Sequence, residues 1–526
     1  MTFRVLVTDP IAQEGIDILK GGAEVDVRLG LPKDKLIASL GDYDALVVRS
    51  ETKVTAEVIE AGQRLQVIGR AGVGVDNIDV EAASRRGIIV VNAPEGNTIS
   101  AAEHALALLL AVARHIPQAY QQLQKGIWRR QEHMGVEVRG KVLGIVGLGR
   151  VGSEVAKRAR GMEMKLLVYD PYVSAEQASR LGAEVVSLED LVRRSDFITI
   201  HTTLTSTTHG LIGARELSLA KPTAYIINAA RGGIVDEAAL RQAVDQGRLA
   251  GAAVDVFTQE PATENPLFGS DKIIVTPHLG ASTAEAQTNV AVDTAEQVLA
   301  VLRGQPVRYA VNAPLVAPEA YAQLFPYIAA AANLGRLLNQ LLEGQLEAVT
   351  ILYEGEIANH DSRPLKAALL SGLLEAVTDE RVNVVNVDHV VAHRGLKITE
   401  QHNLTCENYS SLLTAEVKAS RGKSLAAATL MRGETHIVRL NDYWMDVVPT
   451  GGYFLFIDHR DRPGLIGSVG NILGQADINI SSMQVGRLQP RGRALMVLGL
   501  DGPIREEHRK QLLAIPDVYA VRLVKL

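Results

Sequence analysis

A glycine-rich run at residues 147–152 (GLGRVG) follows an apolar stretch and opens a helical pattern, and this arrangement constrains the fold more than any other feature. In such a run the first glycine permits a tight turn, the second lets the backbone approach a pyrophosphate, and the third allows a helix to pack closely on a strand. The free N–H groups at the start of the helix attract phosphates. Gly147, Gly149 and Gly152 therefore predict a dinucleotide site on a β-α-β unit.

Asp170 indicates which dinucleotide binds. It ends the next apolar stretch, about 20 residues beyond the loop, where an acidic side chain accepts hydrogen bonds from the ribose hydroxyls. A carboxylate there repels a 2′-phosphate, so NAD is favoured over NADP. Asp170 also precedes Pro171, which is typical of a turn. The two roles are compatible.

Short apolar runs alternate with helical patterns over the first 300 residues. The strands that we expect lie at 5–7, 45–48, 65–68 and 88–91, and then at 141–146, 166–169, 197–200, 225–228, 251–254 and 273–275. Such alternation is typical of parallel sheets with helices on both faces. We therefore expect an α/β fold with two doubly wound Rossmann-like domains. A helix at 283–302 should return the chain to the first of them, which is then discontinuous.

The pattern changes beyond residue 314. Alanine-rich helices (327–343) and strand-like alternation (382–391 and 411–418) predict an α+β intervening domain, and residues 449–452 predict a linker. The last segment follows a β-α-β-β-α-β order, which is ferredoxin-like. The domain limits that we expect are 1–98 with 284–314, 99–283, 315–448 and 452–526.

Composition excludes several classes of function. A net charge of −6 argues against a general nucleic-acid or membrane binder, and the longest apolar run, 105–113, is too short to cross a bilayer. The single cysteine, Cys406, has no partner for a disulfide or a cysteine-based metal site, and no metal site is expected. The start of the chain carries no signal pattern. We expect a cytoplasmic protein.

Three polar residues follow buried strands of the second domain, where ligands of open α/β sheets bind. His278 can act as a base near neutral pH, Glu260 can orient its ring and favour its protonated form, and Arg231 offers a planar fork for a carboxylate. Each residue alone has an ordinary structural explanation. Their succession at strand ends of one cofactor-binding sheet favours a catalytic set.

At these motifs the chain resembles the D-isomer-specific 2-hydroxyacid dehydrogenases. The resemblance covers residues 1–312 and implies Arg231, Glu260 and His278 as active-site residues, with His278 as the proton donor in the reducing direction. The NAD contacts that the motifs and the resemblance imply are Gly147, Gly149, Arg150, Val151, Gly152, Asp170, Thr202, Ala229, Ala230, Arg231, Asp255, His278 and Gly280. The family usually has a proline near Thr203, so the local cofactor contact differs there.

The first domain adds positive charge at its strand ends. Candidate substrate residues there are Arg49, Ser50, Arg70, Gly74 and Asn97. One carboxylate does not need two further arginines, so a phosphate on the substrate is indicated, although solvated surface arginines are an alternative.

The same residues resemble those of family members that oxidise 3-phosphoglycerate to 3-phosphohydroxypyruvate in serine biosynthesis. In those members, which are homotetramers, a segment similar to 128–130 (WRR) reaches a neighbouring subunit's phosphate site, which makes Arg130 a candidate. The alternative is an ordinary basic patch at a helix end.

The last segment resembles an ACT regulatory domain, and 315–448 resembles the intervening domain of long family members. The resemblance implies that L-serine binds as an effector across a dimer interface, at His459, Asp461 and Asn479. His459 departs from the residue found in some relatives, and a purely structural dimerisation unit is the alternative.

Two other functions remain open from the sequence. One is a different 2-hydroxyacid dehydrogenase of the glyoxylate or lactate type, which would not need the surplus arginines or the ACT-like segment. The other is a non-catalytic NAD-sensing binding protein of the same fold, against which the set of Arg231, Glu260 and His278 argues.

Overall fold

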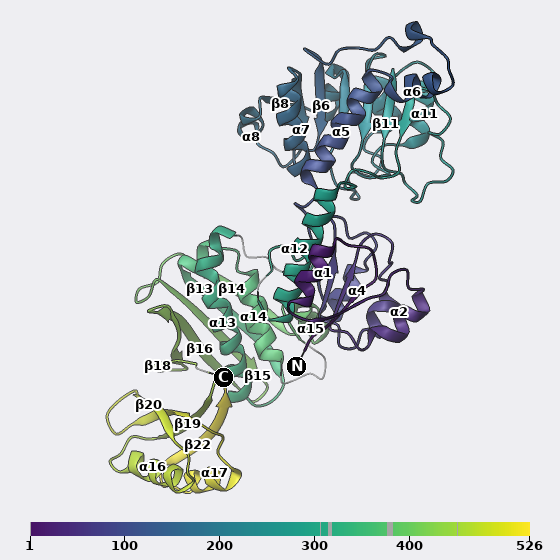
Figure 1. Cartoon of the computed structure of the whole chain (residues 1–526). Helices are drawn as coiled ribbons and strands as arrows, with labels where there is room; N and C mark the ends of the chain where they lie inside the picture. Colours follow the sequence, from purple (N-terminus) through teal and green to yellow (C-terminus); the bar gives the residue numbers. More distant parts are fainter. Residues whose placement is uncertain (1, 306, 314–317, 376–381, 450) are drawn as a thin grey trace.

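The chain folds into a series of bodies built on four sheets, of five, seven, six and four strands (Figure 1). This computed structural model describes residues 2–305, 307–313, 318–375, 382–449 and 451–526. The two sheets nearest the N-terminus are wholly parallel, as expected for the α/β class. The domain limits given above stay our proposal.

The first sheet has the strand order β2-β1-β3-β4-β5. Its strands are β1 (Arg4–Val7), β2 (Glu24–Val27), β3 (Ala45–Val48), β4 (Val67–Arg70) and β5 (Ile89–Asn92). Successive side chains point to opposite faces. One face packs against α1 (Gln13–Lys20) and α12 (Ala284–Leu302), and the other against α2 (Lys33–Leu40), α3 (Ala56–Ala61) and α4 (Val80–Arg85). Strand β2 is absent from our sequence expectation because Glu24 and Asp26 interrupt its apolar pattern at the exposed edge of the sheet.

The second sheet has the order β12-β11-β10-β9-β6-β7-β8, a doubly wound arrangement in which the strand order reverses between β6 and β9. Its strands are β6 (Val142–Val146), β7 (Lys165–Tyr169), β8 (Ala183–Val185), β9 (Phe197–Ile200), β10 (Tyr225–Asn228), β11 (Gly251–Val254) and β12 (Ile273–Val275). The six expected strands are confirmed. The short edge strand β8 was not expected, since only Ala183 in it is buried.

Helices cover both faces of this second sheet. In chain order they are α5 (Thr98–Ala113), α6 (Ile116–Gln124), η1 (Arg130–His133), α7 (Arg150–Gly161), α8 (Ala175–Arg180), α9 (Leu188–Arg194), α10 (Ala214–Leu219) and α11 (Glu237–Asp245). α5, α7 and α8 cover one face, and α9, α10 and α11 cover the other.

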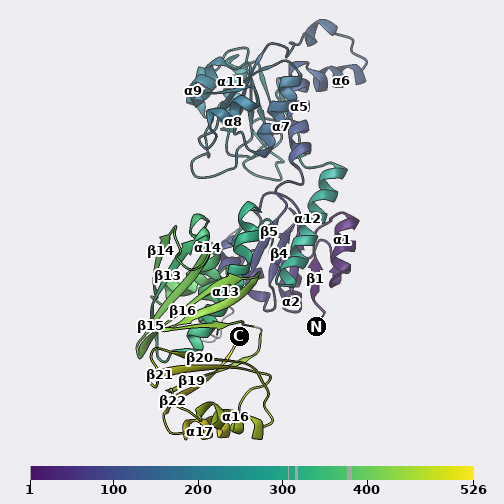
Figure 2. The same ribbon diagram turned by 90° about the vertical axis from the view of Figure 1, so that its left-hand side faces the viewer.

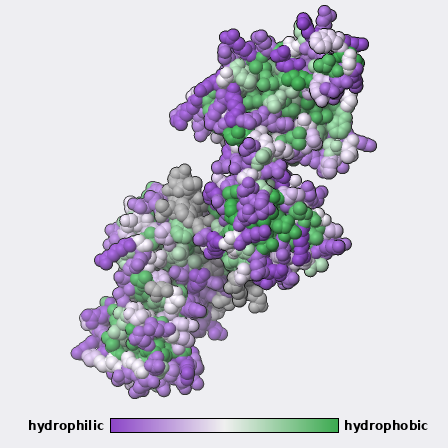
Figure 3. All heavy atoms as spheres, viewed as in Figure 1, coloured by the Kyte–Doolittle hydropathy of each residue, from purple (hydrophilic) through white to green (hydrophobic). Residues whose placement is uncertain are grey.

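Two helices, α5 and α12, lie where the chain passes between the first two bodies (Figures 1 and 2). The surface narrows to a waist at this crossing (Figure 3). Helix α5 is apolar almost all round because it is buried against the second sheet and α7. None of the described helices is by itself long and apolar enough to span a membrane; α5 and α6 meet such a test only as a pair, across a bend of 64°.

The third sheet, with the order β14-β13-β15-β16-β17-β18, forms the intervening body. Its elements are α13 (Pro318–Leu341), β13 (Leu346–Gly355), η2 (Glu356–Asn359), α14 (Arg363–Leu374), α15 (Val387–His393), β14 (Lys397–Asn403), β15 (Ser411–Ala419), β16 (Gly422–Met431), β17 (Glu434–Leu440) and β18 (Tyr443–Val447). The strand expected at 411–418 is confirmed. The strand expected at 382–391 is wrong, because Val387, Val390 and Val391 form the buried side of helix α15 instead.

The last body has the ferredoxin-like order that we expected. Its elements are β19 (Tyr453–Arg460), α16 (Leu465–Gln475), β20 (Ile480–Arg487), β21 (Arg493–Leu500), α17 (Glu506–Leu513) and β22 (Val518–Lys525), in a sheet of order β20-β21-β19-β22. Of the linker expected at 449–452, Thr450 lies outside the described residues.

Helices α13 and α14 approach each other through two glycines. A Cβ built on Gly335 would lie 2.1 Å from the carbonyl oxygen of Leu369, and one on Gly372 would lie 2.2 Å from that of Ala332. Neither clash can be relieved by a side-chain rotation, because both neighbours are backbone atoms.

We predict that Gly335→Ala destabilises the intervening body by about 1–3 kcal/mol, because the helices must move apart. Thermal unfolding measures this as a lower midpoint. The control is Gly161→Ala at the end of α7, where a Cβ meets nothing within 4 Å. Equal midpoints for Gly335→Ala and the wild type would contradict this close packing.

Candidate active site

Strand ends of the first two sheets face a shared cleft. A cavity of about 730 Å³ is lined by Arg49, Ser50 and Arg70 from the first body and by Glu260 and His278 from the second. A neighbouring cavity of about 150 Å³ is lined by residues that the sequence assigned to the cofactor, namely Val151, Thr202, Ala229, Ala230, Arg231, His278 and Gly280. Asn97, at the start of α5, lines both cavities. The cleft thus brings most of the expected site residues together.

The glycine loop has the geometry that a pyrophosphate requires. Gly147 has a φ of +92°, a conformation that residues with a side chain rarely adopt. A Cβ on Gly152 would lie 2.1 Å from the carbonyl oxygen of Gly147, so helix and loop touch directly. At Gly149 a Cβ would meet nothing within 4 Å, which leaves open space beside the first turn of α7. These features fit a dinucleotide at the helix N-terminus.

Asp170 ties the end of β7 to the glycine loop. Its Oδ2 accepts a hydrogen bond of 2.8 Å from the N–H of Leu148, and its Oδ1 accepts one of 2.9 Å from the N–H of Tyr172. The second bond is the turn geometry expected before Pro171, so Asp170 shapes the turn while its carboxylate lies beside the loop.

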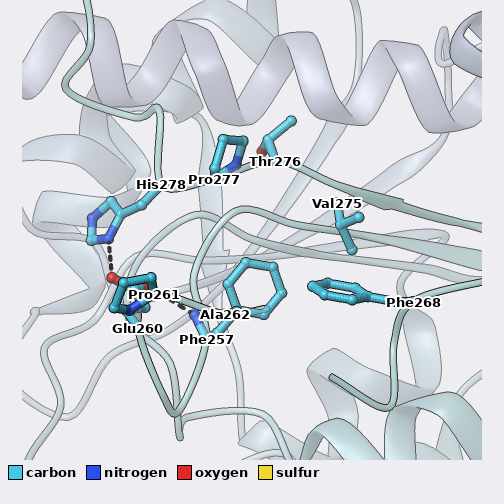
Figure 4. A pocket seen from close by; sticks show the side chains of 9 residues that line it. All are labelled: Phe257, Glu260, Pro261, Ala262, Phe268, Val275, Thr276, Pro277 and His278. Carbon is cyan, nitrogen blue, oxygen red and sulfur yellow. Dashed lines mark hydrogen bonds and ion pairs between the residues drawn. The ribbon is translucent and has the colours of Figure 1, made fainter. Parts of the chain in front are cut away.

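His278 and Glu260 form a pair at the edge of the cleft. The Nδ1 atom of His278 lies 2.7 Å from Oε2 of Glu260, while Oε1 accepts a hydrogen bond from the N–H of Phe257 (Figure 4). Burial raises the pKa of Glu260, but the bonds to His278 and Phe257 outweigh it and hold the pKa below its usual value. Glu260 is therefore an anion at neutral pH and favours a proton on the ring.

Behind this pair lies an apolar cavity of about 290 Å³. Phe257, Phe268, Val275 and Pro277 line it together with Glu260 and His278 themselves (Figure 4).

Asp255 anchors the turn that carries His278. Its side chain is completely buried and accepts hydrogen bonds from Thr276 Oγ1 and from the N–H groups of Leu279 and Gly280. The structure gives this carboxylate a role in shaping the turn. These donors already occupy both carboxylate oxygens. The expected contact of Asp255 with NAD stays a prediction.

Arg231 reaches from the second body toward the first. Its Nη1 donates to the carbonyl of Ala230, and its Nε lies 3.8 Å from Oδ2 of Asp76. A Cβ on Gly74 would lie 2.6 Å from Arg231 Nη2, so Gly74 makes room for this guanidinium. Arg231 thus belongs to both sides of the cleft.

Arg70 is the most buried cation of the cleft. Burial, reinforced by the charges of Arg231 and Arg49, lowers the pKa of Arg70 to about 10. Its Nε is buried without a hydrogen-bond partner among the described residues, and Gly72 leaves the space that its guanidinium occupies. Such a group is poised for an anion.

Two residues that the sequence reasoning missed hold the Arg49 loop. The carboxylate of Asp9 accepts hydrogen bonds from the N–H groups of Arg49 and Thr52, at 2.6 and 3.1 Å. The amide of Asn77 donates to the carbonyls of Arg49 and Thr52. The sequence feature that could have indicated Asp9 is its position just after strand β1, at the edge of the sheet where polar side chains of open α/β folds are used.

Two expected residues have other surroundings. Arg150, at the start of α7, lies 3.4 Å from Glu95 of the first body. Arg130, in η1, does not line either cleft cavity of its own chain, so only a neighbouring subunit's site could use it.

Known proteins match this chain over its whole length. Residues 106–280 match the D-isomer specific 2-hydroxyacid dehydrogenase NAD binding domain, 323–441 the D-3-phosphoglycerate dehydrogenase intervening domain, and 453–517 the ACT domain. D-3-phosphoglycerate dehydrogenase of Synechocystis is 47% identical over 99% of this chain and 95% of its own, and that of Bacillus subtilis is 41% identical over 100% of both. The chain belongs to the D-3-phosphoglycerate dehydrogenase family.

The family assignment makes the protein an NAD-dependent dehydrogenase, with NAD as its cofactor. Among solved structures, TT0316 protein from Thermus thermophilus is 35% identical, with a TM-score of 0.55, over 59% of this chain and all of its own. The departure at Thr203 does not remove the cofactor cavity, which Thr203 itself lines.

The ACT domain of this family member does not bring the three effector candidates together in one chain. Strands β19 and β20 both pair antiparallel with β21, so His459 lies near Arg487 and Asn479 lies beside the other end of the sheet. Asp461 Oδ2 accepts from Arg487 and from the N–H of Arg491, whereas Asn479 donates to Asp501. This separation fits the expected site across a dimer interface, which would join these residues from two copies and stays a prediction.

We predict that Gly149→Ala and Gly152→Ala separate cofactor binding from folding. The methyl group at Gly149 enters the open space and should weaken NADH binding by about 10- to 100-fold with an unchanged unfolding midpoint, since a clash of about 1–3 kcal/mol falls on the ligand. The methyl group at Gly152 would clash with the carbonyl oxygen of Gly147, so Gly152→Ala should lower both the affinity for NADH and the unfolding midpoint.

The measurements are a fluorescence titration with NADH and thermal unfolding, with Gly161→Ala at the other end of α7 as the control. If Gly149→Ala binds NADH as tightly as the wild type, no pyrophosphate lies at this loop.

Proposed function

We propose that the protein oxidises 3-phospho-D-glycerate to 3-phosphohydroxypyruvate with NAD, the first step of phosphorylated L-serine biosynthesis. The observation that carries the substrate is the cavity lined by Arg49 and Arg70 together with the His278–Glu260 pair, with Arg231 lining the adjoining cavity. Relatives named for this substrate match the chain from end to end, which supports the same choice.

The substrate's two anionic groups divide between the two sides of the cleft. Arg231, whose fork suits a planar carboxylate, binds the carboxylate and polarises the C2 oxygen. Arg49 and Arg70, with Ser50, Asn97 and the backbone at Gly74, bind the phosphate. Burial, and after it the charges of Arg231 and Arg49, lower the pKa of Arg70, and a bound anion would offset both effects.

The chemistry needs a base beside the C2 hydroxyl. His278 takes the hydroxyl proton, and Glu260 fixes the ring through Nδ1 so that the other ring nitrogen faces the cleft. Bound NAD supplies the acceptor for the C2 hydride. In the reducing direction the same imidazole returns the proton. Closure of the two bodies over the cleft excludes water.

The NAD contacts that we propose are Gly147, Gly149, Arg150, Val151, Gly152, Asp170, Thr202, Ala229 to Arg231, Asp255, His278 and Gly280. We further propose a homotetramer with L-serine as an effector and a cytoplasmic location. The exposed apolar side chains of Tyr120, Trp128 and Met134, beside Arg130, support a subunit contact at α6 and η1.

We predict that NADH absorbance will fall rapidly with 3-phosphohydroxypyruvate and slowly with glyoxylate or pyruvate. Arg70→Met should raise KM for the phosphorylated acid by about 10- to 100-fold, since a charged hydrogen bond contributes about 1.5–3 kcal/mol, and should change kinetics with glyoxylate little. Arg85→Met, which removes a surface cation paired with Glu81, is the matched control.

Absence of turnover with all three acids would rule out the enzyme. Preference for an unphosphorylated acid would rule out the substrate.

We predict that Glu260→Gln shifts the acid limb of the kcat/KM profile to lower pH. Glu260 remains ionised at neutral pH because its pKa is lowered, and its charge stabilises the protonated ring. Without that charge the protonated ring loses its ion pair, while the looser ring reduces kcat by about 10- to 100-fold. His278→Gln should reduce kcat by about 10²- to 10⁴-fold.

Glu264→Gln, an exposed carboxylate of the same loop, serves as the control. An acid limb at the wild-type pH in Glu260→Gln would show that this carboxylate does not act on the ring.

A further inference from the structure

Helix α5 carries a histidine against the ends of the second sheet. His104 lies in the apolar part of the helix, which packs on β10, β11 and β12, and its side chain is only 19% exposed. Its Nε2 lies 3.1 Å from Oδ1 of Asp255 and 3.5 Å from Oγ1 of Thr276. His104 is not among the residues that line the two cleft cavities.

The partner of His104 is the carboxylate that shapes the catalytic turn. Besides His104, Asp255 accepts hydrogen bonds from Thr276 Oγ1 (2.6 Å), Leu279 N–H (2.8 Å) and Gly280 N–H (2.9 Å). Its own carbonyl accepts from the N–H of His278, at 2.8 Å. Loosening this carboxylate would therefore loosen the backbone on both sides of His278.

The turn needs such a brace because of its conformation. His278 has a φ of +52°, in the left-handed region that non-glycine residues seldom occupy. Burial raises the pKa of Asp255, yet the hydrogen bonds led by that from His104 lower it overall. The carboxylate thus remains an anion able to accept from the turn.

The same face of α5 touches the far end of this segment. Ser100, one helical turn before His104, has its Oγ 2.7 Å from Oγ1 of Thr283, which caps α12. Asn97, at the start of the helix, lines the cleft. Helix α5 therefore contacts the segment 276–283 near both of its ends.

We propose that His104 is a positioning residue: by donating from Nε2 to Asp255 it fixes the turn 276–280 and so the orientation of His278 toward the substrate. The kinetic part of this inference rests on the function proposed above. The structural part, the bracing of the turn, does not.

Three variants of the full-length protein test the proposal. His104→Leu removes the donor, His104→Gln keeps an N–H donor at a similar reach, and Glu103→Gln changes an exposed neighbour paired with Arg158 on the outer face of the helix. Steady-state kinetics, thermal unfolding and hydrogen–deuterium exchange of the peptide spanning 276–283 are measured for each.

His104→Leu should lower kcat by about 10- to 100-fold with KM values within about threefold of the wild type, as expected for a small misplacement of the base. Exchange of the 276–283 peptide should become faster, because Leu279 and Gly280 lose a fixed acceptor. His104→Gln should recover most of both, and Glu103→Gln should resemble the wild type.

An unchanged kcat or unchanged exchange in His104→Leu would overturn the proposal. Equal losses in the Leu and Gln variants would also overturn it, since the hydrogen bond would then be irrelevant. If the wild type fails to turn over 3-phosphoglycerate, the proposed function falls, while the exchange measurement still decides whether His104 braces the turn.

Discussion

The burial of a guanidinium group beside two others in the cleft is a constraint on which much of this structure depends. Arg49, Arg70 and Arg231 come from different strand ends, and burial of Arg70, followed by the charges of Arg231 and Arg49, lowers the pKa of Arg70. Asp9 and Asn77 fix the Arg49 loop, and Asp76 faces Arg231. The scaffold thus holds in advance a positive site whose strain a doubly anionic substrate relieves.

On the other side of the cleft, hydrogen bonds stabilise two buried carboxylates. Asp255 and Glu260 are carboxylates whose burial would raise the pKa of each, and in both cases hydrogen bonds lower it instead. Backbone N–H groups supply part of this compensation, so the anions also define the course of the chain. The His278–Glu260 pair is therefore a consequence of how the loops after β11 and β12 satisfy their polar groups.

The sequence predicted the features that depend on local pattern. Strand ends, the glycine loop and the succession of Arg231, Glu260 and His278 follow from periodicity and residue type, and the structure brings these residues to one cleft. The edge strands β2 and β8 could not be predicted, because exposed strands need no alternation of apolar residues. The valines before and within α15 were read as a strand because valine favours strands, whereas packing against the intervening core decides for a helix. The role of His104 could not be predicted, because a single histidine in an apolar helix carries no local pattern and its partner, Asp255, lies far along the chain.

Distance along the molecule limits how the ACT domain can influence the cleft. It packs on the intervening body through a shared hydrophobic core that includes Phe454, Phe456 and Val524. Polar contacts add to it, since Gln484 accepts from the N–H of Asp446 and Arg522 pairs with Glu343. The intervening body in turn meets the first domain where Asn383 donates to the carbonyl of Gly87, just before β5. The intervening body and the first domain, by contrast, have separate hydrophobic cores. Because Asp461 and Asn479 lie toward opposite ends of one sheet, an amino acid held by both would join two chains. Any effect on the cleft would then pass through the relative placement of whole domains.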